Sequence, residues 1–344
     1  MLKIETMMPA MRLIGWCRNI DQSCARNFRG IFKASLMRSL LGQGYIRPYT
    51  ENYGWRLTAK GYKWLSDHGY PMKQDLHTQN AARRFEHAAV VVTMYAAGIS
   101  PFQSGVEDFS EQGGYLPAFA LRARCGQDSL GSNQVVGFLR LGKRMLAVHY
   151  PHPERKIILQ REYDCAERMM LRSGCTDLGF LFCGQSYASI YRSLVNAETS
   201  DVQRKKRSYA SLFSQSRFAF LLPCDGLGAL QLQLMSLPDY RLQIGAVLGE
   251  RAGQMSALDM PDCDFIDSEH ELPVRLMLDM ELCRVENAAW QAKEAGYPGL
   301  VLAAFEEQVS FLEQLFPPPF YHIAAIPGDL LEILEGGAAH APAL

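Results

Sequence analysis

The residues best suited to metal-dependent chemistry are two carboxylates, Asp279 and Glu281, at the end of the strand-like run 275–280. If the strand continues, side chains two positions apart point to the same face of a sheet. With Glu162 they would supply the oxygen ligands that Mg²⁺ requires in a PD-(D/E)xK-type nuclease. That site also needs a lysine two residues after the glutamate, where this chain has Cys283. We therefore expect an ordinary polar turn, keep a degenerate nuclease-like domain as the alternative, and expect no cofactor unless that alternative brings Mg²⁺.

A second candidate for chemistry is Ser186, in the segment 184–188 with the sequence GQSYA. It follows an apolar strand-like run and opens a helix, which is the setting of a nucleophile elbow. The candidates for its base and for the carboxylate that orients the base are His270, His322, Asp225 and Asp279. The elbow lacks its last glycine, and a serine at this point is also a common helix cap. A serine hydrolase is therefore only a minor alternative.

Histidine and cysteine spacings give little support to a bound metal. His149 and His152 form H-x-x-H, but they lie in a proline-containing turn and no third ligand is evident. The nine cysteines include no C-x-x-C pair, and their number is odd. This usage predicts reduced thiols in a cytoplasmic protein without structural zinc. The chain also lacks a Walker A motif and a Rossmann fingerprint, so no nucleotide cofactor is expected.

The elements with the clearest pattern lie within residues 31–65. An amphipathic helix comes first, with Ile31, Leu36, Leu40 and Leu41 as its apolar set. Two short strand-like runs follow at 45–49 and 55–58, and a further helix begins after Thr58. A helix, a hairpin and a helix in this order predict a winged helix, in which the helix before the hairpin can enter a DNA groove.

This winged helix carries a set of polar side chains that could contact duplex DNA. On the helix before the hairpin, lysine and arginine suit phosphates or guanine, serines suit the backbone, and glutamine suits a base. The hairpin and the start of the next helix would contact flanking phosphates. The predicted contacts are Lys33, Ser35, Arg38, Ser39, Gln43, Arg47, Tyr49, Asn52, Tyr53, Arg56, Lys60 and Lys63. The alternative is that these residues form ordinary solvated faces.

The distribution of charge favours the DNA interpretation, although the whole chain has a net charge of only -1. Residues 1–90 hold 14 Lys+Arg against 6 Asp+Glu, whereas residues 220–344 hold 5 against 19. A basic N-terminal part is expected to meet a polyanion. With 48% hydrophobic residues and no apolar run of the roughly 20 residues that span a bilayer, we expect neither a membrane partner nor a signal peptide.

The pattern Leu40-Leu41-x-x-Gly44-Tyr45-Ile46-Arg47, followed by Trp55-Arg56-Leu57-Thr58-x-Lys60-Gly61-x-x-x-Leu65, resembles the winged helix of the replication-relaxation family. Members of that family are found on bacterial plasmids and integrative elements. The run 83–92, RRFEHAAVVV, is similar to the family's linker helix, and the resemblance extends over about residues 10–100. It implies DNA binding in replication, mobilisation or transcription of a mobile element. A replication or relaxase protein and a second copy of the chain are the implied protein partners.

The organisation predicted for the whole chain is α/β, or α+β overall. It comprises a winged-helix domain at 1–75, a linker helix and loops at 76–132, an α/β domain at 133–336 and a flexible tail at 337–344. Strands and helices alternate in the last third, which predicts a mainly parallel or mixed sheet, and a nuclease-like fold is one form of it. Further strand candidates are 218–223 and 241–248. The expected function is sequence-specific or structure-specific binding of duplex DNA.

Overall fold

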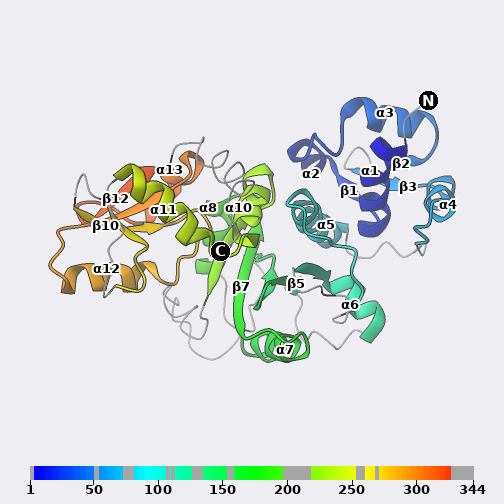
Figure 1. The fold of residues 1–344 in the computed structure, drawn as a ribbon. Helices are drawn as coiled ribbons and strands as arrows, with labels where there is room; N and C mark the ends of the chain where they lie inside the picture. The colour runs from blue at the N-terminus through cyan, green and yellow to red at the C-terminus, as the bar shows by residue number, and fades with distance from the viewer. Residues whose placement is uncertain are drawn as a thin grey trace. The chain divides into compact units, whose positions relative to one another are not determined.

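A computed structural model describes residues 4–49, 54–72, 81–105, 109, 113–125, 135–152, 159–196, 218–252, 260–267 and 271–326. The chain divides into two compact units. The first contains residues 1–205 and 222–233, and the second contains residues 206–221 and 234–344. Helices mix with antiparallel and parallel strands throughout (Figure 1), so the predicted α/β class is confirmed.

The first unit begins with a helix-rich segment that carries a small antiparallel sheet. Its elements are α1 (Ile4–Cys17), β1 (Ile20–Asp21), α2 (Gln22–Asn27), α3 (Ala34–Gly42), β2 (Ile46–Pro48), β3 (Gly54–Leu57) and α4 (Ala59–Asp67). The strand order is β1-β3-β2, with β3 antiparallel to both neighbours. This order of elements, with the β2–β3 hairpin after α3, is that of a winged helix.

Short side chains fix where two of these helices start. The Asp21 carboxylate accepts a hydrogen bond of 2.7 Å from the Cys24 backbone N–H at the start of α2. The Thr58 hydroxyl accepts one of 3.2 Å from the Gly61 N–H at the start of α4. Each cap satisfies a backbone donor that the helix itself cannot pair.

The core of this segment uses most, but not all, of the apolar residues assigned to α3. Leu36, Met37 and Leu40 are buried, whereas Ile31 is half-buried and Leu41 is 42% exposed. The assignment of Leu41 to the inner face was therefore wrong. At about 100° per residue, Leu41 lies beside Ala34 and Arg38 and turns away from Leu36.

A glycine in α4 allows the helix to pass close to the start of the hairpin. A Cβ atom at Gly61 would lie 2.3 Å from the Tyr45 carbonyl oxygen, which is shorter than any tolerated contact. Backbone atoms cannot move aside without displacing α4 or β2. The glycine in the Lys60-Gly61 pair therefore has a packing role.

We expect Gly61→Ala to destabilise the protein by about 1–3 kcal/mol, because the added methyl group overpacks a rigid contact. Helix propensity alone would favour alanine by about 1 kcal/mol, so the two effects have opposite signs. Urea unfolding measures the difference, with Ser66→Ala at an exposed position of the same helix as the control. A stabilised Gly61→Ala variant would refute the close contact.

The remainder of the first unit consists of α5 and most of a five-stranded sheet, whose last strand and following helix are each divided between the two units. Helix α5 (Ala81–Ala96) buries Ala88 and the apolar run 90–92. The sheet has the order β4-β5-β6-β7-β8. Strand β5 is antiparallel to both β4 and β6, and β6 is parallel to β7. Its elements are β4 (Gly114–Pro117), α6 (Ala118–Cys125), β5 (Val135–Leu141), β6 (Arg144–His149), α7 (Leu159–Arg172), β7 (Asp177–Gly184), α8 (Tyr187–Asn196), β8 (Ala219–Pro223) and α10 (Gly226–Ser236).

The second unit contains a four-stranded sheet with the order β12-β11-β10-β9. Its elements are α11 (Tyr240–Ala252), β9 (Phe265–Asp267), β10 (Leu272–Leu276), α12 (Val285–Glu294), β11 (Leu300–Ala304), α13 (Glu306–Leu315) and β12 (Tyr321–Ala325). Strands β10, β11 and β12 are parallel, as the alternation predicted. The strand expected at 241–248 is wrong, because this segment lies in α11. Tyr240 and Ile244 are buried four positions apart, which is a helical spacing.

Candidate nucleic-acid interface

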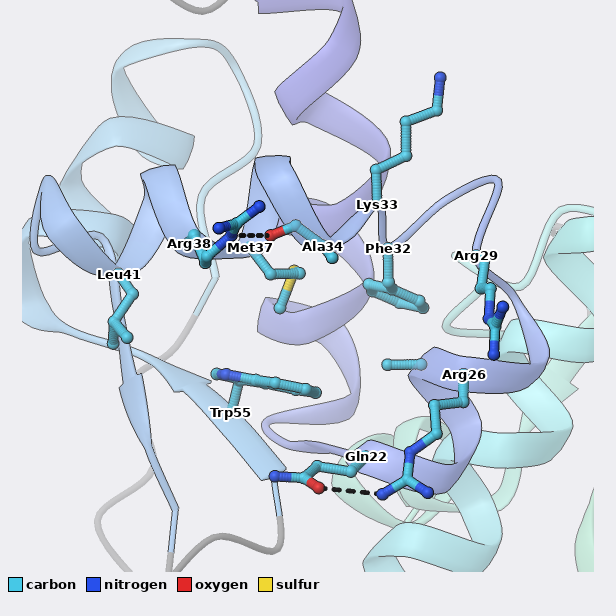
Figure 2. Close-up of a pocket in the computed structure, with 11 residues that line it drawn as sticks. Gln22, Arg26, Arg29, Phe32, Lys33, Ala34, Met37, Arg38, Leu41 and Trp55 are labelled. Carbon is cyan, nitrogen blue, oxygen red and sulfur yellow. Dashed lines mark hydrogen bonds between the residues drawn. The ribbon is translucent and has the colours of Figure 1, made fainter.

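A hollow of about 710 Å³ lies in the winged helix between α2, α3 and β3 (Figure 2). Its inner wall is apolar and is formed by Ala25, Phe32, Ala34, Met37, Leu41 and Trp55. Around it stand four cations, Arg26 on α2, Arg29 and Lys33 on the turn between the helices, and Arg38 on α3. Figure 2 shows Arg26 and Arg29 on the side of the hollow opposite Trp55, Lys33 extending away from the Trp55 ring, and Arg38 on α3 next to Ala34.

The four cations are exposed, and the hydrogen-bond acceptors described for two of them are uncharged. Arg26 donates a hydrogen bond of 3.1 Å to the Gln22 amide oxygen, and Arg38 donates one of 3.4 Å to the Ala34 carbonyl. No Asp or Glu is among the described residues that line the hollow. The positive charges of the four side chains therefore add to a local field that attracts anions.

Three of the predicted contacts, Ser35, Arg38 and Ser39, lie within α3, and two, Lys33 and Gln43, flank it as its caps. Lys33, Ser35, Arg38 and Gln43 are exposed, and Ser39 is half-buried. From the helical angle, Arg38 is central on the outer face of α3, with Ser35 and Ser39 on one flank. The Gln43 amide nitrogen donates a hydrogen bond of 2.9 Å to the Ser39 hydroxyl, so these two side chains hold one another.

The predicted contacts on the hairpin differ in how far their side chains are exposed. Arg47 is exposed, and Arg56 is half-buried with its guanidinium 5.4 Å from the centre of the Tyr49 ring. Tyr49 was expected on the DNA-facing wing, and this prediction needs correction because the side chain is only 7% exposed. Its ring packs edge-on against Phe85 of α5, at a centroid distance of 6.0 Å. The remaining two hairpin candidates, Asn52 and Tyr53, lie outside the described residues.

The two lysines of α4 have different surroundings. Lys63 is exposed. The Lys60 ammonium donates a hydrogen bond of 2.8 Å to the Gln43 carbonyl and lies 4.8 Å from the centre of the Tyr45 ring. Its charge therefore sits at the carboxyl end of α3, where the helix dipole favours a cation. Lys60 positions α3 in addition to adding positive charge.

The carboxylates predicted for metal binding are instead paired with arginines. Asp279 is 2% exposed, and its two oxygens each accept a hydrogen bond of 2.7 Å from Arg241 Nη2. The Tyr240 hydroxyl donates to the same carboxylate. Glu281, also 2% exposed, accepts a hydrogen bond of 2.5 Å from Arg275. The nuclease site is therefore not formed by this pair, because guanidinium groups occupy the positions that Mg²⁺ would need.

The backbone explains why the expected strand register fails here. Strand β10 ends at Leu276, and Met280 has a φ of 51°, so Asp279 and Glu281 lie in a tight turn rather than on an extended strand. The third candidate, Glu162, lies in α7 of the first unit, and its side chain is outside the described residues.

Burial and neighbouring charges shift the pKa values of Asp279 and Glu281 in opposite directions. Burial opposes ionisation of Asp279, but the charge of Arg241, the hydrogen bonds from Arg241 and Tyr240, and the charge of Arg275 together outweigh burial and hold the pKa of Asp279 below its usual range. Burial raises the pKa of Glu281 to about 7, because it outweighs the attraction of Arg275, and the carboxylate of Asp279 adds repulsion. Glu281 is thus the carboxyl group of the pair that takes up a proton near neutral pH.

The raised pKa of Glu281 predicts a stability that depends on pH. Between its ordinary value of 4.5 and about 7, the folded protein binds the proton more tightly than the unfolded chain. This stabilisation is therefore complete below 4.5 and is lost as the pH rises through about 7. Glu281→Gln should remove that decline in the free energy of unfolding, measured with urea across this range. Glu313→Gln, an exposed position in the same unit, is the control. An unchanged pH slope in Glu281→Gln would contradict the prediction.

The residues proposed for a serine hydrolase mainly cap helices. The Ser186 hydroxyl accepts a hydrogen bond of 3.2 Å from the Ser189 N–H, and the Asp225 carboxylate accepts one of 3.0 Å from the Gly228 N–H. A hollow of about 720 Å³ lies nearby, but it is lined by Gln185 and Ser189 and not by Ser186. His270 is outside the described residues, and His322 belongs to the second unit. In the described part of the chain, Ser186 and Asp225 are thus engaged as helix caps.

The two histidines of H-x-x-H differ in exposure, because His149 is buried and His152 is half-buried. His149 is 1% exposed and packs against the rings of Phe180 and Phe182 in the central sheet. Burial lowers the pKa of His149 to about 3, so the ring is neutral at physiological pH. It serves as a packed core residue. None of the eight cysteines whose side chains are described forms a disulfide.

Several residues of the basic hollow were missing from the predicted contacts. Arg26 and Arg29 extend the cationic rim onto α2 and the following turn, and Leu41 and Trp55 supply apolar surface. The spacing of Gln22, Arg26 and Arg29 at three and four positions is a sequence signal for a shared helix face. The meeting of Leu41 with Trp55 has no such signal, because the hairpin brings them together.

The fold and this surface define a winged-helix protein with an attached α/β portion. The chain matches no protein-family model, no curated protein and no solved structure. Among the described helices, none is long and apolar enough to cross a membrane.

Proposed function

We propose that the chain binds duplex DNA through α3, with Arg26, Arg29, Lys33 and Arg38 as its main cations. One observation carries the proposal: these four exposed charges surround the start of α3, and no described acidic residue lines the hollow between them. Phosphates lie on both sides of a DNA groove, so a helix flanked by cations can be held there. Arg47 on the hairpin and Lys63 on α4 extend this surface.

The biological role we propose follows from the resemblance to the replication-relaxation family. The protein would regulate replication, mobilisation or transcription of a plasmid or integrative element, with a replication or relaxase protein as its partner. The nuclease alternative loses support, because Arg241 and Arg275 neutralise the two carboxylates on which it depended.

The test is fluorescence anisotropy of a labelled duplex at a series of KCl concentrations. If at least four of the six cations at this surface meet phosphates, the slope of log K against log salt should be on the order of −4 or steeper. The double variant Arg26→Ala/Arg29→Ala should reduce the magnitude of that slope by about 2. Lys143→Ala, which removes an exposed cation from the β5–β6 turn of the same unit, is the control.

Two outcomes would count against the proposal. Absence of salt-dependent binding would remove it. Cleavage of the duplex in Mg²⁺ that Glu281→Gln abolishes would favour the nuclease alternative instead.

A further inference from the structure

The outer face of α3 has an apolar stripe beside its cations. Leu41 is 42% exposed and Ala34 is exposed, although most apolar side chains of this segment are buried. Both line the hollow, together with Met37 and the half-buried ring of Trp55. Figure 2 shows Ala34, Arg38 and Leu41 following one another along the helix. A ligand that binds at this surface therefore meets apolar and cationic side chains together.

The spacing of this stripe fits the step of a DNA duplex. Ala34, Arg38 and Leu41 lie at helical positions i, i+4 and i+7, so they share one face. At 1.5 Å per residue, the apolar ends of the stripe are about 10 Å apart along the axis, which is about three base-pair steps. A helix lying in the major groove would place both apolar side chains over base edges, with the arginine between them.

We propose that this stripe reads thymine methyl groups next to a guanine contacted by Arg38; the inference rests on the proposed DNA-binding function. The thymine C5-methyl is the apolar group that the major groove presents, and guanine offers two acceptors suited to arginine. Arg29 and Lys33 on the turn are available for the phosphates at the groove edge. The cations of this surface complement the DNA phosphates, and its apolar side chains complement the methyl groups in the major groove.

The experiment compares two copolymer duplexes in which each guanine neighbours a thymine or a uracil, poly(dT-dG)·poly(dC-dA) and its uracil form poly(dU-dG)·poly(dC-dA), which differ by the thymine methyl group. Competition against a labelled duplex at one fixed KCl concentration gives their relative affinities. We expect the uracil copolymer to bind about three- to fourfold more weakly for each methyl group that the wild-type protein buries. A second comparison adds a methyl group to cytosine. The 5-methylcytosine form of poly(dG-dC) should bind more tightly than unmethylated poly(dG-dC).

A matched pair of variants distinguishes a direct contact between Leu41 and the methyl group from an effect of the methyl group on DNA shape. Leu41→Ala should remove most of the difference between the two copolymers and leave the salt slope unchanged, because no charge is lost. Arg47→Ala should reduce the salt slope and preserve the difference. Leu41 is exposed, so its truncation leaves the core of the winged helix intact.

The outcomes distinguish this inference from the function on which it rests. Equal affinity of the wild-type protein for both copolymers, with the salt slope intact, would overturn the methyl readout and leave DNA binding in place. A copolymer difference that persists unchanged in Leu41→Ala would also overturn it, because DNA shape would then be the cause. After either result, an acidic, amphipathic segment of a partner protein would replace the thymine methyl groups as the proposed ligand of the stripe. Loss of all salt-dependent binding would remove both proposals.

Discussion

Replacing Arg38 by alanine should weaken the binding of duplex DNA by about ten- to a hundredfold, the largest effect expected of any single variant at the interface. Arg38 is central on the exposed face of α3, and its only described hydrogen bond is the 3.4 Å contact with the Ala34 carbonyl in its own helix. Its guanidinium is therefore available for a base or a phosphate. The magnitude is that of removing one bidentate hydrogen-bonded pair, about 1–3 kcal/mol.

The salt dependence distinguishes a phosphate partner of Arg38 from a base partner. If Arg38 binds a phosphate, Arg38→Ala lowers the slope by about 1 and weakens all sequences alike, whereas a guanine partner predicts relaxed preference at one position. Anisotropy with the same duplex, at several KCl concentrations, measures both quantities. Lys143→Ala again reports the effect of removing one exposed charge elsewhere in the unit. An affinity of Arg38→Ala equal to that of the control would remove α3 as the reading element.

The largest effect on stability should follow Arg241→Met, at about 3–5 kcal/mol of unfolding free energy. Arg241 contacts Asp279 at 2.7 Å and Asp264 at 3.1 Å, and these carboxylates are 2% and 12% exposed. Without the guanidinium, two buried negative charges lose their partner and must either stay uncompensated or take up protons. Removing one member of a buried pair costs more than removing both.

Three measurements test this expectation. Urea unfolding of Arg241→Met gives the loss, and Lys293→Met, at an exposed position of α12, should change stability by less than about 1 kcal/mol. The double variant Arg241→Met/Asp279→Leu should recover part of the loss. The deficit should also shrink as the pH falls. Arg241 holds the pKa of Asp279 below its unfolded value, and this contribution to stability exists only above that value. A single variant as stable as the control would refute the role of the ion pair.

Local patterns in the sequence were sufficient for much of the fold. The parallel strands β10 to β12 follow from the predicted alternation of strands and helices in the last third. Helix α4 begins directly after Thr58, as expected, and the Thr58 hydroxyl caps it. These features depend on hydrogen bonds and apolar spacing within a few residues, so the neighbouring sequence determines them.

The candidate site was only partly accessible to the same reasoning. The basic face of α3 could be predicted in part, because a helical period places Ser35 and Arg38 away from Leu36 and Leu40. The burial of Tyr49 could not, since Phe85 covers it from a helix far along the chain. The strand predicted at 241–248 failed for a related reason, because a short apolar run does not distinguish a strand from a buried helix.

The sequence by itself determined a winged helix with a basic face and an α/β remainder, because capping, periodicity and composition are local properties. Only the tertiary structure decided that Asp279 and Glu281 are ion-pair members rather than metal ligands, since Arg241 lies 38 positions from Asp279 in the chain. Folding likewise brought Trp55 beside Leu41 and created the apolar surface between the cations. Charge pairing and burial depend on which distant residues meet, and local sequence does not contain that information.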